Sequence, residues 1–313
     1  MKKIISALLV ILMLALLMLA CVNVSAENPI TVEVDFGTIQ FDTPPVNING
    51  RVLVPVRAIF EAMGATVRWN AETKTVTSKL DNTIVVMQID STTMRINGEP
   101  KNLDVAARII NDRTYVPARA AAEAFDGKVQ WIGQQNKVAI STKAFTEKLK
   151  SIQSYSSVRK LELGETQSVS AFSLSYFPEY ETLTGALDGT DFEIISSGSK
   201  YCAILGIRSD IYMGDTPTLT QEYVSSVAEG MVKIAEGTLI SSDIVNICNT
   251  QFMKISYTAY GTAQGITDNT ANIVTYMGIH DGVVYTMTLS EYGDVPFTVK
   301  SDLNYMATTL LIK

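Results

Sequence analysis

Apolar and polar positions alternate over the first part of the chain, as they do in strands that bury one face. The alternation runs over residues 30–41. After Pro55, which fits the first turn of a helix because its missing N–H costs nothing there, the apolar spacing becomes helical and ends at Gly64. An extended hairpin follows at residues 67–78. This segment is therefore predicted to contain strands, one short helix and a hairpin.

The pattern of this segment occurs twice. Residues 51–69, RVLVPVRAIFEAMGATVRW, recur as residues 113–131, RTYVPARAAAEAFDGKVQW, at an offset of 62 positions (113 − 51). A repeat of this length indicates a structural unit present in two copies. We expect residues 30–143 to form one duplicated domain, with repeats at about 30–90 and 91–143, because a single copy can barely cover its own apolar helix face. The second helix ends in Asp-Gly where the first ends in Gly-Ala, which moves the stop glycine by one residue and predicts a changed cap.

Charged residues, prolines and tryptophans recur at equivalent positions of the two copies. They are Asp42, Arg51, Pro55, Arg57, Glu61 and Trp69 in the first copy, and Asp104, Arg113, Pro117, Arg119, Glu123 and Trp131 in the second. We interpret them as structural. Each helix arginine is expected to be buried and paired with the glutamate four residues on, or with the aspartate of its own copy. The alternative is a pair of anion-binding arginines. The tryptophans are interpreted as core side chains, and the alternative is that sugars stack on them.

Residues 144–168 change in character and carry Phe145, Leu149, Ile152 and Val158 at roughly helical spacing. We predict a connecting helix and linker here, and a second domain over residues 169–313. Its strands are expected at 170–178, 192–195, 201–207, 239–247, 251–259, 272–279 and 283–289, and its helices at 219–236, capped by Thr218, and at 297–312. The predicted fold class is α+β: a two-repeat domain of strands with one short helix per repeat, followed by an α/β sandwich with an antiparallel sheet.

A signal peptide is predicted for residues 1–26. Lys2 and Lys3 precede an uncharged apolar run, and small residues end the segment at Ala26. Lipidation at Cys21 is one alternative, and an uncleaved anchor is another because the run approaches the length of a short span. In each case the chain is exported, and we expect it to be secreted or on the cell surface.

The formal charge of −7 argues against nucleic acid and against an anionic membrane surface as general partners. Membrane attachment is expected only through the signal segment. Cys202 and Cys248 lie in the C-terminal half. An oxidising compartment permits a disulfide between them, but sequence gives no spatial distance. Two separate thiols are the favoured interpretation, and the pairing stays open.

His280 is the one histidine of the chain, and it lies in a predicted hairpin turn. A serine triad needs a histidine base, and a histidine-based copper centre needs several imidazoles. The sequence has no Cys-x-x-Cys and no phosphate-binding glycine motif. We predict no catalytic residue, no cofactor and no metal. A pair of carboxylates that hydrolyses a glycan is the alternative, since that chemistry needs no histidine.

The repeat resembles the copper amine oxidase N-terminal domain-like, or stalk, repeat of secreted bacterial proteins. The resemblance rests on Asn49-Gly50-Arg51, Val54-Pro55-Val56-Arg57-Ala58, Glu61 and Val67-Arg68-Trp69-Asn70, and on their second copies. In the oxidases this domain is an accessory stalk, and the copper and the quinone cofactor belong to a separate catalytic domain. The resemblance therefore implies a docking or presentation module. Residues 169–313 resemble the PsbP-like α/β/α sandwich in the order of their elements, which implies a binding or assembly module.

These inferences lead to two hypotheses. The first is a non-catalytic, exported envelope or extracellular protein whose stalk repeats dock or present a C-terminal binding domain, with cell-wall polymer or an envelope protein as partner. The second is a cell-envelope hydrolase with a carboxylate pair in a cleft of the C-terminal domain. It requires two facing carboxylates about 5 to 9.5 Å apart.

Overall fold

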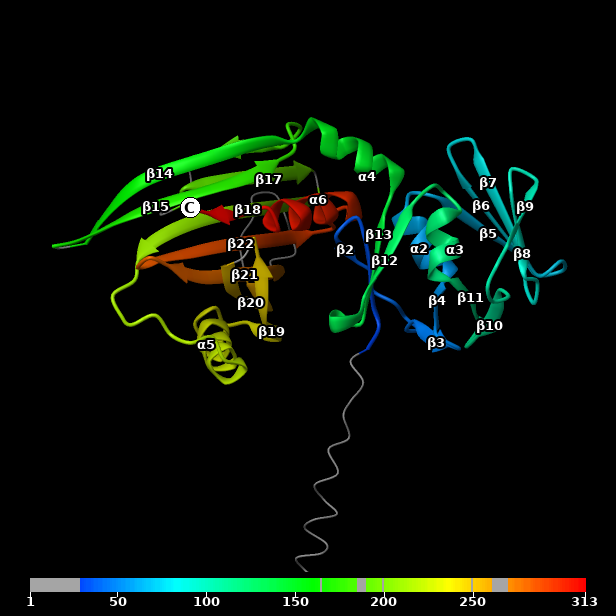
Figure 1. The fold of residues 1–313 in the computed structure, drawn as a ribbon, viewed down its shortest axis with the longest axis horizontal. Helices are drawn as coiled ribbons and strands as arrows, with labels where there is room; N and C mark the ends of the chain where they lie inside the picture. The colour runs from blue at the N-terminus through cyan, green and yellow to red at the C-terminus, as the bar shows by residue number, and fades with distance from the viewer. Residues whose placement is uncertain (1–28, 164, 185–189, 199, 249, 261–269) are drawn as a thin grey trace, which may run out of the picture.

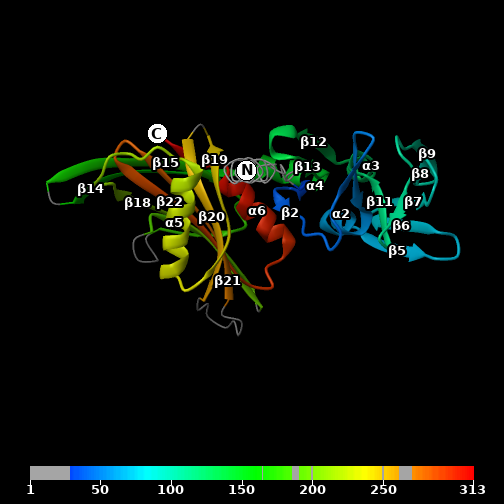
Figure 2. The same ribbon diagram turned by 90° about the horizontal axis from the view of Figure 1, so that it is seen from below.

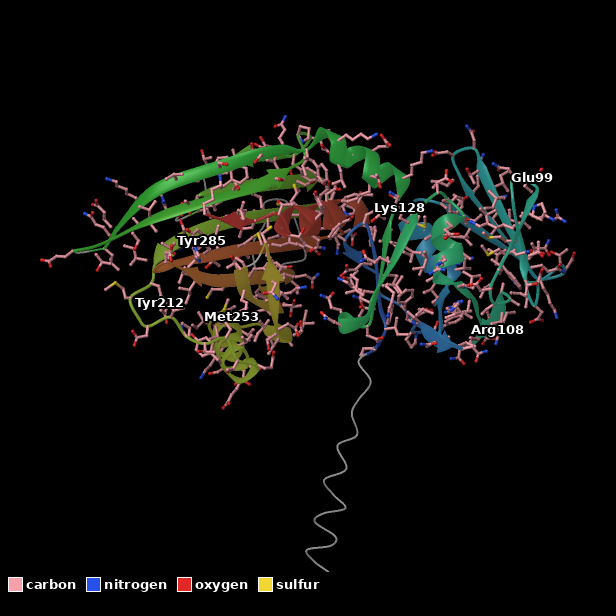
Figure 3. All side chains as sticks on the ribbon, in the orientation of Figure 1. Glu99, Arg108, Lys128, Tyr212, Met253 and Tyr285 are labelled. Carbon is pink, nitrogen blue, oxygen red and sulfur yellow. The ribbon has the colours of Figure 1, made fainter. Side chains whose placement is uncertain are left out.

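The computed structural model describes residues 29–163, 165–184, 190–198, 200–248, 250–260 and 270–313. The predicted signal peptide, with Cys21, lies outside the described residues. Two lobes lie along the long axis of the molecule (Figure 1). The side chains of Glu99 and Arg108 belong to the first lobe, and those of Met253 and Tyr285 to the second (Figure 3). Helices and several antiparallel sheets together confirm the α+β class.

The first lobe is made of short elements. In chain order they are β1 (Thr31–Val34), β2 (Gly37–Thr38), β3 (Val46–Ile48), β4 (Arg51–Pro55), α2 (Val56–Ala62), β5 (Thr66–Asn70), β6 (Thr75–Leu80), β7 (Thr83–Gln88), β8 (Thr93–Ile96), β9 (Glu99–Asn102), β10 (Arg108–Ile110), β11 (Arg113–Pro117), α3 (Ala118–Glu123), β12 (Lys128–Ile132) and β13 (Lys137–Ser141).

The central sheet of the first lobe joins strands from both copies of the sequence repeat. Its order is β10-β11-β4-β3. β4 and β11 are antiparallel, and Val54 pairs with Val116. These valines occupy the same position of the repeat. The register of β4 and β11 therefore places a local two-fold axis between the two valines. Two sheets flank the central one, with the orders β5-β6-β7-β8-β9 and β12-β13-β1-β2.

A single hydrophobic cluster fills the first lobe and draws side chains from both copies. Phe60 of α2 and Phe125, just after α3, meet edge to face with ring centroids 5.0 Å apart. Both rings are buried, so they contribute large apolar areas to the core.

Both short helices end in the same way. Gly64 has a φ of 87° after α2, and Asp126 has a φ of 58° at the equivalent position after α3. Gly127 serves a different purpose, because a Cβ there would lie 2.8 Å from the carbonyl oxygen of Ala122. The helix is kept and its capping residue changes from glycine to aspartate. The predicted shift of the stop to Gly127 is wrong, because aspartate tolerates the left-handed conformation at the original position.

The second lobe is made of longer strands. Its elements are β14 (Gln153–Leu163), β15 (Thr166–Tyr176), β16 (Glu181–Leu183), β17 (Phe192–Gly198), β18 (Tyr201–Ile211), α5 (Gln221–Ile234), β19 (Thr238–Ile247), β20 (Thr250–Tyr260), β21 (Thr270–His280), β22 (Val283–Gly293), α6 (Phe297–Ala307) and β23 (Leu311–Ile312).

A seven-stranded antiparallel sheet, ordered β16-β17-β18-β22-β21-β20-β19, forms the middle of the second lobe. The β14-β15-β23 sheet and α6 pack on one face of it through a buried cluster that includes Phe172, Leu205 and Leu303. α5 covers the β19–β20 end through a separate cluster that includes Ala228 and Ile255 (Figure 2).

The connecting helix predicted over residues 144–168 is mostly wrong. Only α4 (Lys143–Lys148) and one turn of 3-10 helix after it are helical, and β14 then pairs along its whole length with β15. Val158, whose position suggested a helix face, is 75% exposed. The residues that alternate inward on β14 include serine, so the strand period is weak in apolar residues.

Two helix boundaries of the second lobe also differ from expectation. α5 is capped by Thr220, whose hydroxyl accepts a hydrogen bond from the backbone N–H of Tyr223, and not by Thr218. The last helix ends at Ala307, and the chain then forms β23 beside β15. The Asp281-Gly282 turn joins β21 to β22 as predicted, with both residues at positive φ.

The lobes meet at the turn between β1 and β2. Asp35 accepts hydrogen bonds from the backbone N–H of Thr142 at 2.6 Å and from its hydroxyl at 2.7 Å. The carbonyl of Asp35 accepts a third from the Ser301 hydroxyl of α6. Gly37 leaves space for Phe297, because a Cβ there would lie 2.5 Å from that ring. Burial raises the pKa of the Asp35 carboxyl, and the hydrogen bonds from Thr142 only partly oppose this effect.

Candidate functional site: two equivalent grooves

A groove of about 610 Å³ lies on the first lobe, where β4 leads into α2. We call it groove 1. It is lined by Asp42, Pro55, Val56, Arg57, Ala58, Glu61, Val67, Trp69, Val76, Ile109, Asp112, Arg113 and Thr114. Pro55 directs the chain from the strand into the helix with a φ of −58°, which proline adopts without strain.

A second groove, of about 240 Å³, lies where β11 leads into α3. We call it groove 2. It is lined by Asn47, Gly50, Arg51, Val52, Asp104, Pro117, Ala118, Arg119, Val129, Gln130, Trp131 and Val138.

The two grooves are built from equivalent residues. Seven residues of groove 2, from Asp104 to Val138, lie 62 positions after residues of groove 1, as Arg119 does after Arg57. The remaining wall is exchanged: residues 109 and 112–114 of the second copy line groove 1, and their equivalents in the first copy line groove 2. Each groove therefore takes one wall from each copy of the repeat.

Ion pairs between the copies cross in the same way. Arg51 Nε donates to Asp104 Oδ2 at 2.9 Å, and Arg113 Nε donates to Asp42 Oδ2 at 2.9 Å. The Arg113 guanidinium lowers the pKa of the Asp42 carboxyl. The predicted structural role of these four residues takes the form of contacts between the copies, whereas the aspartates were expected to pair with the helix arginine of their own copy.

The two helix arginines differ from expectation and from each other. Arg57 Nη1 donates to Glu61 Oε1 at 3.1 Å and to the carbonyl of Val67 at 3.2 Å. The predicted pairing four residues apart is thus confirmed for Arg57, but the predicted burial is wrong because 55% of its side chain is exposed.

Arg119 is exposed and does not pair with Glu123. Glu123 Oε2 instead lies 2.9 Å from Lys101 Nζ on β9. Within the described residues, the Arg119 guanidinium has no hydrogen bond or ion pair. The lysine accounts for this difference, because the equivalent position of the first copy holds the apolar Ile39.

The tryptophans are not core side chains. Trp69 is 40% exposed and Trp131 is 48% exposed. They lie on β5 and β12, each the edge strand of its sheet. The repeat signal pointed to both residues but not to their exposure. It did not point to Ile109, which joins groove 1 only through the pairing of the two copies.

One cavity of the second lobe, beside β20 and β21, does not contain the predicted carboxylate pair. This cavity of about 370 Å³ is lined by Thr216, Pro217, Thr218, Leu219, Thr250, Gln251, Met253, Met277, Gly278, Ile279 and His280. It holds no carboxylate. His280 is 45% exposed, and its Nε2 lies 3.6 Å from Asp281 Oδ2.

A cavity of about 470 Å³ lies between the lobes and includes two carboxylates, Glu33 and Asp243. Glu33 is engaged by Lys137 at 2.9 Å. Among the described residues, no group of three or more His, Cys, Asp and Glu side chains is placed to hold a metal ion. Cys202 and Cys248 are both free thiols. Across the described part of the chain, every helix is too short or too polar to cross a membrane.

Comparison with known proteins gives a family-model match within the first lobe. No curated protein matches the chain. Among solved structures, the solution structure of cyanobacterial PsbP (CyanoP) from Synechocystis sp. PCC 6803 matches with 15% identity and a TM-score of 0.35, over 52% of this chain and 93% of that chain. Residues 33–140 match the family model of the copper amine oxidase N-terminal domain, which confirms the resemblance of the repeat and is a match to an N-terminal domain, not to a catalytic one.

Proposed function

We propose that the chain is a non-catalytic, exported protein of the cell envelope, and that its duplicated first lobe docks it onto envelope polymer through grooves 1 and 2. The observation that carries the proposal is the pair of equivalent grooves, each with an exposed tryptophan and an exposed arginine. The second lobe is the module that this docking presents. The predicted signal peptide supports export.

The chemistry of the grooves supports binding to a glycan. An indole ring gives a large, rigid apolar face with little conformational entropy to lose, and its N–H donates a hydrogen bond. An arginine guanidinium offers planar donors for hydroxyl, carboxylate or phosphate oxygens. Large exposed aromatic side chains that gather in a groove are typical of a binding surface. A two-copy site also favours a repeating ligand, because the second contact becomes intramolecular once the first has formed.

Co-sedimentation of the mature chain, beginning at Glu27, with purified insoluble cell-wall polymer tests the proposal. The double variant Trp69→Ala/Trp131→Ala should remain in the supernatant. The control is Tyr260→Ala, which removes an aromatic side chain of the second lobe that is 79% exposed and should leave binding unchanged. Thermal melts of each variant confirm that it is folded. Sedimentation of the folded double variant at the level of the wild type would overturn the docking role.

A further inference from the structure

We infer that the two grooves are chemically different subsites: groove 2 takes a negatively charged group of a glycan, a carboxylate or a phosphate, and groove 1 takes an uncharged sugar unit. This inference rests on the proposed function, because it assigns the ligand chemistry of the docking grooves. Its basis is the charge that each groove keeps once its own ion pairs are counted.

Groove 1 keeps a negative charge. Its two arginines are both engaged, Arg113 by Asp42 and Arg57 by Glu61. Asp112 is the remaining charged side chain of the lining, and no other described residue forms an ion pair or hydrogen bond with its carboxylate. An anion entering groove 1 therefore meets an excess of carboxylates over guanidinium groups, and both guanidinium groups are already engaged.

Groove 2 keeps a positive charge. Arg51 is engaged by Asp104, and Arg119 is left without a partner among the described residues. The position equivalent to Asp112 is Gly50, which has no side chain to repel an anion. Glu123, the equivalent of the glutamate that occupies Arg57, is not in the groove lining and is held by Lys101.

The available guanidinium lies in the same groove as the Trp131 ring. A charged sugar can stack on this ring while its carboxylate or phosphate accepts charge-assisted hydrogen bonds, which are stronger than neutral ones. In groove 1 the Trp69 ring offers stacking with hydrogen-bond acceptors beside it, which suits hydroxyl and amide groups. The asymmetry comes from two differences between the copies, Lys101 in place of Ile39 and Gly50 in place of Asp112.

The two tryptophans make each groove separately observable. The chain has two tryptophans, so Trp69→Phe leaves Trp131 as the reporter of groove 2, and Trp131→Phe leaves Trp69 as the reporter of groove 1. Fluorescence titrations of both variants use three probes: a neutral N-acetylglucosamine tetramer, an oligogalacturonate and a glycerol phosphate oligomer. The last two separate carboxylate from phosphate as the source of the charge.

At least one charged oligomer should bind at Trp131 about tenfold more tightly than the neutral tetramer. This preference should weaken as salt is raised, because an exposed charge is screened. Trp69 should prefer the neutral tetramer. Arg119→Gln, made in the Trp69→Phe background, should remove the preference for the charged oligomer. The control is Arg95→Gln in the same Trp69→Phe background. It changes an exposed arginine of β8 that lines neither groove, and it should leave the preference unchanged.

A gain of binding is the stricter test. Glu61→Gln with Asp112→Gly, in the Trp131→Phe background, releases Arg57 and gives groove 1 the charge of groove 2, so Trp69 should now respond to the charged oligomer. Glycine is compatible with position 112, whose φ is 57°. Equal binding of charged and neutral oligomers at both tryptophans would overturn the inference, as would no response to any oligomer. Sedimentation of the wild-type chain with polymer decides the docking role independently of either result.

Discussion

The second lobe contains the most deeply buried ion-paired carboxylates, whereas the ion pairs of the repeated residues lie at the surface of the first lobe. In the first lobe, the pairs formed by repeated residues are about half exposed, as in Arg51–Asp104 with side-chain exposures of 53% and 55%. In the second lobe, Asp302 is 6% exposed and pairs with Lys148, and Asp191 is 5% exposed and pairs with Arg159 at 2.7 Å. The charged residues that recur in the sequence are therefore accessible to solvent.

Exposed and buried ion pairs are expected to contribute differently to the stability of the fold. An exposed ion pair contributes little because water and salt screen it. A buried pair contributes no more when intact, but removing one member leaves the other without compensation. The stability of the first lobe is therefore expected to reside in its shared apolar core, and its repeated charges are available for recognition. Four predictions test this comparison.

The largest effect is expected from the core of the first lobe. Phe60 is fully buried against Phe125, so Phe60→Ala should lower the free energy of unfolding by about 3 to 5 kcal/mol. Trp69→Ala, which truncates a half-exposed ring of the same repeat, should cost clearly less. Urea unfolding followed by circular dichroism measures both. Equal losses would mean that the groove tryptophan also supports the fold.

The second effect concerns the buried carboxylate of the second lobe. Asp302 accepts hydrogen bonds from Lys148 and, at 2.5 Å, from the Tyr180 hydroxyl. Asp302→Ala should cost about 2 to 3 kcal/mol of unfolding free energy. The cost is at the low end for a buried pair because Lys148 keeps Glu179 at 2.6 Å. Glu179→Ala is the control, and an equal loss in both variants would contradict the importance of burial.

Elements set by local sequence were predicted, whereas features that depend on contacts between distant residues were not. Strands with regular apolar alternation, and the hairpin at Asp281-Gly282, were predicted because local spacing and turn chemistry determine them. β14 was missed because its inward positions include Ser157, while Val158 points outward. The repeat identified most of the residues that line the grooves. Their exposure was not predicted, because it depends on which strand ends a sheet and which side chain of the other copy is near.

The third prediction uses two carboxyls whose pKa values move in opposite directions. Burial raises the pKa of Asp35, so the folded state favours its protonated form and loses stability as pH rises above the ordinary aspartate value of about 3.9. Arg113 lowers the pKa of Asp42, so that contribution is present above about 3.9 and is lost as pH falls.

Melting temperatures of Asp35→Asn and Asp42→Asn, measured against the wild type from about pH 3 to pH 7, test these signs. As pH rises, the melting temperature of Asp35→Asn should increase relative to that of the wild type. The melting temperature of Asp42→Asn should decrease relative to that of the wild type. The change for Asp42→Asn is expected to be small because its ion pair is exposed. If the melting temperatures of the two variants changed with pH in the same direction, burial of Asp35 at the lobe contact would not determine the sign of its pH dependence.

The smallest effect on stability is expected at the helix arginines. Arg57 makes an exposed ion pair and one backbone hydrogen bond, so Arg57→Ala should cost less than about 1 kcal/mol. Arg119 has no partner among the described residues, so Arg119→Ala should leave the melting temperature at the wild-type value. Arg57, which is bonded, should contribute slightly to stability and little to anion binding. Arg119 should contribute to anion binding alone. Thermal melts and polymer sedimentation of the same two preparations compare these roles directly, and a lower melting temperature for Arg119→Ala than for Arg57→Ala would reverse the assignment.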